Sequence, residues 1–232
     1  MNDNPYAVHD DTIAAAFAPV DARVAFLKKT YTLLLAAVLT FAGTLCLAGI
    51  EGSPLYNMAM SLSGMNPLLY AAVFIGGAIL VHAMAEKPFG IVFFFGFAVL
   101  WGLLSAPLVL LASNIAPDLV STAALMTTLV FTGLTAYVFK SGKDFGFLGG
   151  MLWTVMFGMF GVAICGWLFG FHIGVWFSYL GVALFSGFIL YDTSNILKRY
   201  PTTAHVSAAM VLFVDVILLF KHILIILLSS RD

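Results

Sequence analysis

Apolar runs of membrane-spanning length alternate with short polar segments along most of the chain. A helix needs about 20 apolar residues to cross the ~30 Å hydrocarbon core of a bilayer, so each run predicts one spanning helix. The expected spans are about 30–50, 68–85, 90–112, 119–139, 147–166, 175–197 and 205–228. This pattern predicts an all-α membrane protein with seven transmembrane helices.

The segments between the runs carry residues that end or bend helices. Residues 51–67 are rich in Pro and Gly and predict a loop with one interfacial turn at most. Pro107 lies inside the third run and predicts a kink. Residues 1–29 form a polar N-terminal tail, expected to be mobile as far as Pro19. Its last ten residues predict a helix that runs into the membrane, with Asp21 as N-cap. Residues 30–232 then make one membrane domain.

Composition agrees with the membrane assignment. Only 9% of the 232 residues are charged and 62% are hydrophobic, whereas a soluble domain averages about 25% charged residues. The net charge of −1 leaves no basic face for nucleic acid, so the lipid bilayer is the expected partner. No zinc-ligand spacing, nucleotide-binding loop or hydrolase motif is found, so the sequence predicts neither an enzyme nor a cofactor.

Lys and Arg residues outside the spans fall almost entirely on one side of the predicted membrane. One side holds only Arg231, and the other holds Arg23, Lys28, Lys29, Lys87, Lys140, Lys143, Lys198 and Arg199. Cytoplasmic loops are enriched in these residues, so the N-terminus and the polar turn at 198–203 are expected in the cytoplasm. An odd number of spans leaves the C-terminus outside.

One carboxylate lies inside each of the last two apolar runs, Asp192 in the sixth and Asp215 in the seventh. The midpoint between positions 192 and 215 falls next to Pro201, where the chain is expected to reverse. On antiparallel helices each acid then lies roughly 17 Å from the turn, at ~1.5 Å per residue, so both lie at equal depth. We therefore expect the two carboxyl groups to face each other across one helix–helix seam.

A paired acid inside hydrocarbon indicates proton or cation chemistry, because an isolated buried charge is costly. Two like charges in contact cannot both ionise readily, so the pair is expected to share a proton or to hold a cation. Asp192 and Asp215 are therefore a candidate pH sensor, a candidate part of an ion pathway and a candidate weak calcium site. In the alternative interpretation, each acid only hydrogen-bonds a neighbouring helix.

Three further polar residues are candidates to support the pair. His82 lies near the end of the second run and is either a positive partner for the acids or a histidine satisfied by a hydroxyl. His222 lies seven residues after Asp215, on roughly the same helical face, and is a candidate for the outer part of a pathway. Asn195 lies in the same run as Asp192. Lys221 is expected to extend towards the outer interface.

Five segments together resemble the Bax inhibitor-1 family, also called the transmembrane BAX-inhibitor-motif family. The sixth- and seventh-helix patterns are YDTSNI at 191–196 and LFVDVILLFKHILIIL at 212–227, and FLKKTYTLL at 26–34 is similar to the family's entry to the first helix. KPFGI at 87–91 and KDFGFLGGML at 143–152 are most similar to the bacterial YccA-type branch. The resemblance covers roughly residues 23–232.

The resemblance implies a bundle of six helices around a central seventh. It also implies a pH-dependent calcium leak whose sensing aspartates correspond to Asp192 and Asp215. Some members of the YccA-type branch lack the second acid, which this chain keeps. Some leak-type members latch the pair with an arginine in the second helix, and here the second span has no Arg or Lys before Lys87, so His82 is the candidate substitute.

Two hypotheses of different classes follow. The first is a bacterial inner-membrane protein that passes cations, with calcium as the permeant ion, slowly and under pH control. The second is a regulatory partner of the membrane AAA+ protease FtsH, which the YccA-type branch is known to bind and restrain. The retained acid pair favours the first hypothesis, and the YccA-like segments favour the second.

Overall fold

The computed structural model describes residues 13–171 and 173–231, and the regular elements in those residues are helices. The all-α class is thus confirmed. The elements are α1 (Val20–Ala48), α2 (Pro54–Ser63), α3 (Pro67–Met84), α4 (Gly90–Ile115), α5 (Asp118–Ser141), the 3₁₀ turn η2 (Gly146–Leu148), α6 (Gly149–Phe169), α7 (Trp176–Lys198) and α8 (His205–Ser229).

Six of the helices in these ranges are long and apolar enough to cross a membrane: α1, α4, α5, α6 with the preceding η2 turn, α7 and α8. The remaining expected span corresponds to α3, whose apolar part, Leu68–Met84, is shorter. The chain is thus a multi-pass membrane protein, and the count of seven spans stays a prediction.

Two local predictions were wrong. Residues 54–63 form the helix α2 rather than a loop, because the Ser53 hydroxyl caps it by accepting a hydrogen bond from the Tyr56 N–H at 3.0 Å. Pro54 occupies the first turn of that helix, where its missing N–H costs nothing. In α1 the N-cap residue is Pro19, and Asp21 is the second residue of the helix, two positions after the cap.

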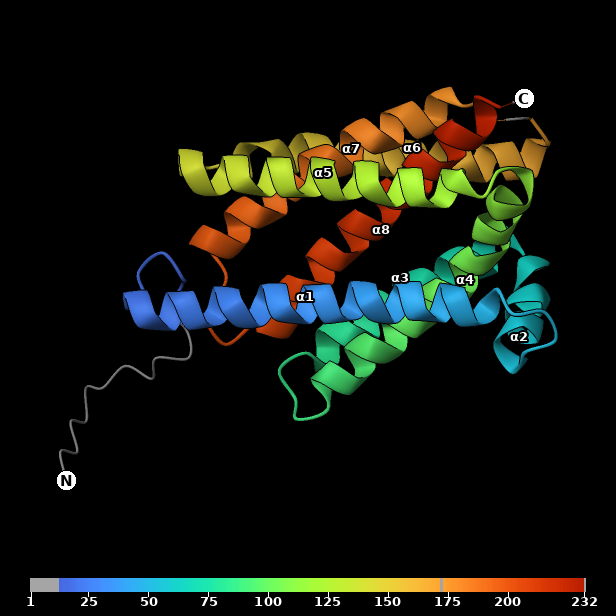
Figure 1. Cartoon of the computed structure of the whole chain (residues 1–232). Coiled ribbons are helices and arrows are strands. Elements are labelled where there is room, and N and C mark those ends of the chain that lie inside the picture. Colours follow the sequence, from blue (N-terminus) through green and yellow to red (C-terminus); the bar gives the residue numbers. More distant parts are fainter. Residues whose placement is uncertain (1–12, 172, 232) are drawn as a thin grey trace.

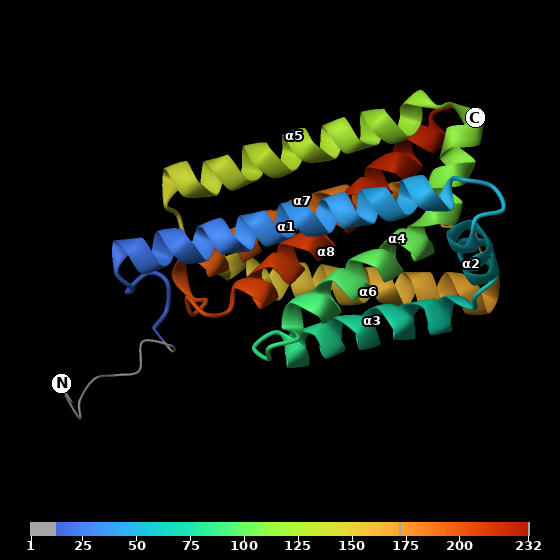
Figure 2. The same cartoon turned by 60° about the horizontal axis from the view of Figure 1, so that its bottom comes forward.

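The long helices run back and forth between two ends of the bundle (Figure 1). The end that holds Lys140, Lys143, Lys198 and Arg199 is called the basic end below. In Figures 1 and 2, α1 begins near this end and α8 finishes at the opposite one. In Figure 2, α4 also changes direction in its later part, and Pro107 is the proline inside that helix.

The last helix lies deep in the bundle. It packs against α1, α3, α4, α5 and α7, whereas α6 packs on α7 and η2. The expected ring of six helices around a central seventh therefore stays a prediction, since α6 has no comparable interface with α8. Aromatic rings fill the space between α1, α4 and α8: Phe213 of α8 lies edge-on to Phe94 and Phe41, with ring centroids 5.7 Å and 6.3 Å away.

The segment before α1 is held against the turn that joins α7 to α8. Ala14 forms an antiparallel bridge with Pro201, and the Ala15 N–H donates to the Tyr200 carbonyl at 2.8 Å. Ala15 is fully buried, so the expectation of mobility as far as Pro19 is wrong for this part of the tail. The remainder of that expectation falls on residues 1–12, which lie outside the described residues.

Candidate functional site

The two membrane carboxylates lie on α7 and α8, which form the most extensive helix–helix interface in the described part of the chain. Asp192 belongs to α7 and Asp215 to α8. Their side chains are in hydrogen-bond contact with each other. The antiparallel turn around Pro201 therefore brings two acids that are distant in the sequence into one site.

The surroundings of the two acids differ. Asp215 is 4% exposed, whereas Asp192 is half-buried. Asp192 also contacts the side-chain amide of Asn195, one turn further along α7. The Oδ2 atom of Asp215 has no hydrogen-bond partner within the described residues. Since buried polar atoms are nearly always paired, this fully buried oxygen is an exception among the described residues.

A cavity of about 1140 Å³ lies beside the pair. Its walls come from α3, α6, α7, α8 and the turn between α7 and α8, and most of the lining residues are apolar. Asp192, Asp215 and Asn195 line it from α7 and α8. His82 of α3 and Glu86, just after that helix, line it from another side. The carboxyl pair is thus reached from a large and mainly hydrophobic space.

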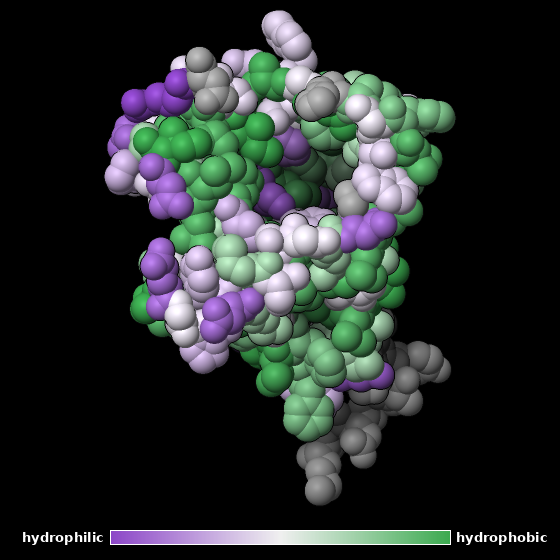
Figure 3. Space-filling model, turned by 90° about the vertical axis from the view of Figure 1, so that its right-hand side faces the viewer, coloured by the Kyte–Doolittle hydropathy of each residue, from purple (hydrophilic) through white to green (hydrophobic). Residues whose placement is uncertain are grey.

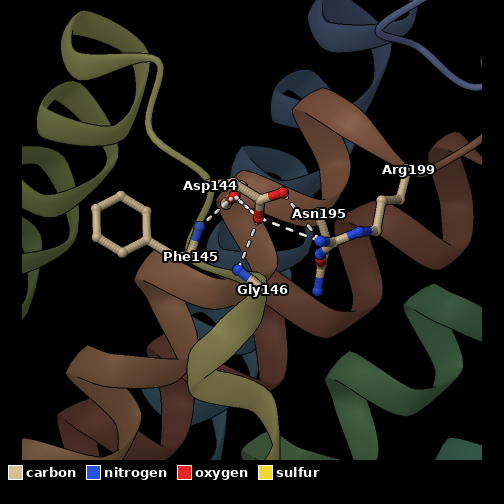
Figure 4. A network of polar contacts seen from close by, with 6 residues as sticks. Asp144, Phe145, Gly146, Asn195 and Arg199 are labelled. Atoms are coloured by element: carbon tan, nitrogen blue, oxygen red, sulfur yellow. Dashed lines mark hydrogen bonds and ion pairs between the residues drawn. The ribbon is translucent and has the colours of Figure 1, made fainter.

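A network of polar contacts lies beside this cavity at the basic end (Figure 4). Arg199, directly after α7, forms an ion pair with Asp144 at 3.0 Å. The same guanidinium donates a hydrogen bond to the Asn195 side-chain oxygen. The Gly146 N–H donates to Asp144 at 2.7 Å, which fixes the carboxylate in the turn before η2. Arg199 therefore joins the α5–α6 connection to a residue that touches Asp192.

Asp144 lies outside the spans, and its neighbours favour the charged form. The Gly146 N–H lowers the pKa of this carboxyl most, burial opposes this effect, and the charges of Arg199 and Lys198 lower the pKa further. Ser194 adds a bond from the Phe145 N–H to its hydroxyl at 3.0 Å. The carboxylate is thus ionised near neutral pH and holds Arg199 at the mouth of the cavity.

The Tyr200 ring completes the basic end of the cavity. Burial raises the pKa of its hydroxyl most, and the nearby carboxylates of Asp192 and Asp215 raise it further. The hydroxyl is therefore a neutral donor at every physiological pH. The Tyr200 backbone carbonyl also accepts a hydrogen bond from the Ala15 N–H. The segment before α1 therefore contacts a residue that lines the same cavity as the carboxyl pair.

The structure places the three predicted supporting residues differently. Asn195 contacts Asp192 directly. His82 lines the same cavity but is exposed. His222 does not line it: its ring stacks on Phe185 at 5.6 Å, and its Nδ1 has no hydrogen-bond partner within the described residues. Only Asn195 of these three is therefore in contact with the pair.

Lys221 does not extend freely towards the interface, contrary to expectation. Its Nζ donates to the Tyr70 hydroxyl at 2.7 Å and lies 5.1 Å from the centre of the Trp101 ring. Hydrogen bonding and a cation–π contact thus hold this ammonium group between α3, α4 and α8.

The calcium expectation rests on few ligands. Among residues 13–171 and 173–231, no group of three or more His, Cys, Asp or Glu side chains is placed to hold a metal ion. Asp192 and Asp215 contribute carboxylate oxygens, and Asn195 contributes an amide beside them. Calcium takes about 6–8 oxygen ligands, so at this pair most of its shell would be water. This suits weak, transient occupancy better than tight binding.

Figure 3 shows the end of the molecule opposite the basic end. This face is hollowed, and both hydrophilic and hydrophobic residues are visible in and around the hollow.

Arg199 and Asp144 are the residues that the sequence interpretation missed. Arg199 was counted only as a charge that sets topology, and Asp144 appeared only within the segment KDFGFLGGML. The available signal was the spacing of Asn195 and Arg199, which lie one helical turn apart and can contact each other. The partner Asp144 lies 55 positions away from Arg199, so no local pattern could supply it.

Comparison with known proteins agrees with this architecture. The family model described as "Inhibitor of apoptosis-promoting Bax1" matches residues 23–232. Protein lifeguard 4 of Mus musculus is 33% identical over 218 residues, which is 90% of this chain and 87% of that protein. Bax inhibitor 1 of Schizosaccharomyces pombe is 30% identical over 225 residues, or 90% of this chain and 79% of that protein.

Bacterial membrane proteins are also similar to the chain. One, from Vibrio cholerae, is 29% identical over 209 residues, covering 87% of both chains. The family model covers nearly the whole sequence, and it includes both helices that carry the acid pair. The chain therefore belongs to the Bax inhibitor-1 family.

Proposed function

We propose that this protein is a slow, pH-controlled cation leak of a bacterial inner membrane, with calcium as the permeant ion. The observation that supports the proposal best is the contact between Asp192 and Asp215 at the wall of a large cavity. The pair acts as the sensor and as a weak, transient calcium site. In this proposal α3 also crosses the membrane, which brings the number of spans to seven, and the basic end faces the cytoplasm.

Competition at the carboxylate oxygens makes the leak sensitive to pH. A proton and a cation use the same oxygens, so cation occupancy falls as the pH falls. Arg199 takes part in this competition because its guanidinium reaches Asn195, which contacts Asp192. In this proposal Arg199, rather than His82, is the cationic group that restrains the pair.

The test is calcium flux into liposomes that contain the purified protein and a calcium-sensitive dye. Asp192→Asn and Asp215→Asn should each flatten the pH dependence of flux, because either change removes the coupling between the acids. The double variant should change little more than one single variant, as expected of residues that act as a unit.

Asp118→Asn is the matched control, since Asp118 is an exposed acid paired with Arg231, and it should keep the wild-type pH profile. A double Asn variant that leaks calcium with the wild-type pH profile would refute the sensor role.

A second candidate function is the regulation of an FtsH-type membrane protease. It is favoured by the YccA-like segments 87–91 and 143–152, which begin in the connections after α3 and after α5 and extend into α4 and α6. In-membrane crosslinking should capture the protease through these connections. Removing residues 1–12 should change the turnover of the protein while Ala15 keeps its contact with Tyr200. Without any crosslinked complex this candidate loses its support.

A further inference from the structure

The cavity beside Asp192 and Asp215 is larger than an ion requires. Its volume is about 1140 Å³. One water occupies about 30 Å³, so a calcium ion with a shell of about 6–8 waters fills only a fraction of it. Pockets that bind small organic molecules measure about 300–1,000 Å³. The space is therefore of the size that holds an organic ligand.

Aromatic rings make up much of the cavity wall. Trp153 and Phe157 line it from α6, Phe74 lines it from α3 and Phe188 from α7. Trp153 lies edge-on to Phe188, with ring centroids 5.7 Å apart. Phe157 is 68% exposed. These rings present hydrophobic area to the cavity, and their faces also attract cations.

α3 and α6 form two of the walls of the cavity. Both helices line it, yet α3 packs on α4 and α8, whereas α6 packs on α7 and η2. Ile79 of α3, which lines the cavity, is 63% exposed. Phe157 of α6 lines the cavity and is exposed as well, so apolar side chains on the outer surface of both helices also border the cavity.

The polar end of the cavity requires a hydrogen-bond donor. Asp215 is almost fully buried, and its Oδ2 has no partner within the described residues. Arg199 is engaged by Asp144 and Asn195, and Glu86 adds another acid. His82 and Tyr200 also line the cavity, but neither is a hydrogen-bond partner of Asp215 Oδ2. An unpaired acceptor in an apolar wall is costly, and a cationic N–H donor relieves that cost most effectively.

We propose that this cavity binds a lipophilic amine. The protonated nitrogen donates its N–H to the carboxyl pair, whose half-buried member Asp192 lines the cavity, and the hydrophobic body lies against Trp153 and Phe157. The ligand enters from the bilayer between α3 and α6. The inference rests on the same carboxyl pair as the proposed leak and adds a class of ligand, an organic cation that blocks the ion site.

An amine fits this site better than a metal ion does. Calcium requires many oxygens, and the pair offers two carboxylates beside one amide. An ammonium group needs only one or two acceptors, and cation–π contacts compensate for the lost water. The large hydrophobic remainder of the cavity is then used by the body of the ligand.

The probe is a dansyl-labelled alkylamine added near neutral pH to the full-length protein in nanodiscs, with empty nanodiscs as the blank. Binding is read as energy transfer from tryptophan to dansyl. Trp153→Phe should remove most of the transfer, because Trp153 lines the cavity. Asp215→Asn should weaken binding at least about tenfold, as expected when a charge-assisted hydrogen bond is lost.

Three matched controls accompany this experiment. Asp118→Asn removes an exposed acid outside the cavity and should not change affinity. Phe157→Ala should weaken binding a fewfold, whereas Phe147→Ala, a change at an exposed ring that does not line the cavity, should not. The N-acetylated probe, which has no charge, should bind at least about tenfold more weakly than the amine.

Equal binding of the amine and its acetylated form would overturn the proposal, and so would equal affinity of the wild type and Asp215→Asn. If Asp215→Asn proves unfolded by thermal denaturation, the acetylated probe and Phe157→Ala still decide the matter on folded protein. Because the readout is equilibrium binding and not flux, a protein that binds the amine but passes no calcium would separate this inference from the proposed leak.

Discussion

At the scale of single residues, Asp144 shows how a partly exposed acid organises a site that it does not enter. Its side chain is 46% exposed, yet it accepts from the Gly146 N–H and pairs with Arg199. Exposed ion pairs contribute little to stability, because water screens them. The pair matters more for position, since it holds the guanidinium next to Asn195 and so next to Asp192.

The stability that Asp144 provides should depend on pH in one direction. Its pKa is lowered below 3.8, first by the Gly146 N–H and then by Arg199 and Lys198. The contribution of Asp144 to stability is therefore fully present when the pH is above the unfolded-state pKa, and it is lost as the pH falls through the folded-state pKa. Asp144→Asn should lower Tm by at most about 2–4 °C near neutral pH, and the difference in Tm between wild type and variant should become smaller below about pH 4.

Thermal unfolding in detergent between about pH 6 and pH 3 measures this gap. Asp144→Glu is the control, because it keeps the charge while displacing the carboxylate from the Gly146 N–H. A gap between wild type and Asp144→Asn that widens as the pH falls would have the wrong sign for a lowered pKa and would contradict this account.

Some contacts between residues of the site can be predicted from the sequence and others cannot. Asp192 and Asp215 were predicted as facing partners because helical rise and one turn determine their depth. The link from Arg199 to Asp144 was not predicted, because it depends on how the α5–α6 connection packs against the end of α7. Contacts set by one helix pair are thus accessible from periodicity, and contacts set by three segments are not.

At the scale of elements, the α1–α4 interface depends on a close approach at Gly102. A Cβ at this position would lie 2.7 Å from the Cβ of Thr44 and 3.3 Å from the Phe41 carbonyl oxygen. Small residues allow helix backbones to come close in membranes, where packing largely replaces the hydrophobic effect.

Gly102→Ala should therefore destabilise the protein by about 1–3 kcal/mol, the usual cost of overpacking. Gly96→Ala, in the same helix, is the matched control, because a Cβ there meets no atom within 4 Å. That control should be neutral or slightly stabilising, since Ala is favoured over Gly inside a helix by about 1 kcal/mol. Thermal unfolding in one detergent compares the two variants, and equal Tm values would show that the α1–α4 contact is loose.

Hydropathy predicts the long elements well and the short ones poorly. Every long apolar run is a helix, because a backbone in lipid must satisfy its own hydrogen bonds. The ends differ because caps depend on single side chains, as at Ser53, which starts α2 in a segment expected to be a loop. The path of residues 13–19 was also missed, since its contacts with Tyr200 and Pro201 are distant in the sequence.

At the scale of the whole molecule, the distribution of charge and the path of the chain together predict an orientation. Eight Lys and Arg residues outside the expected spans, Arg23, Lys28, Lys29, Lys87, Lys140, Lys143, Lys198 and Arg199, face one side and Arg231 the other. Cytoplasmic loops carry such an excess, so the basic end is expected inside and the end of α8 outside. This arrangement requires seven membrane crossings, so it depends on whether α3 spans the membrane.

Reporter fusions test this orientation at the points where the alternatives differ. Fusions after Gly64 and after Lys87 bracket α3 and should report opposite sides of the membrane if α3 spans it. Fusions after Lys143 and Pro201 should report the cytoplasm, and one after Asp232 the outside. Matching signals at Gly64 and Lys87 would leave the six spans that length and hydropathy identify, with α3 as a re-entrant or interfacial helix. A cytoplasmic signal at Asp232 would then follow, because an even number of crossings returns the chain to the side on which α1 begins.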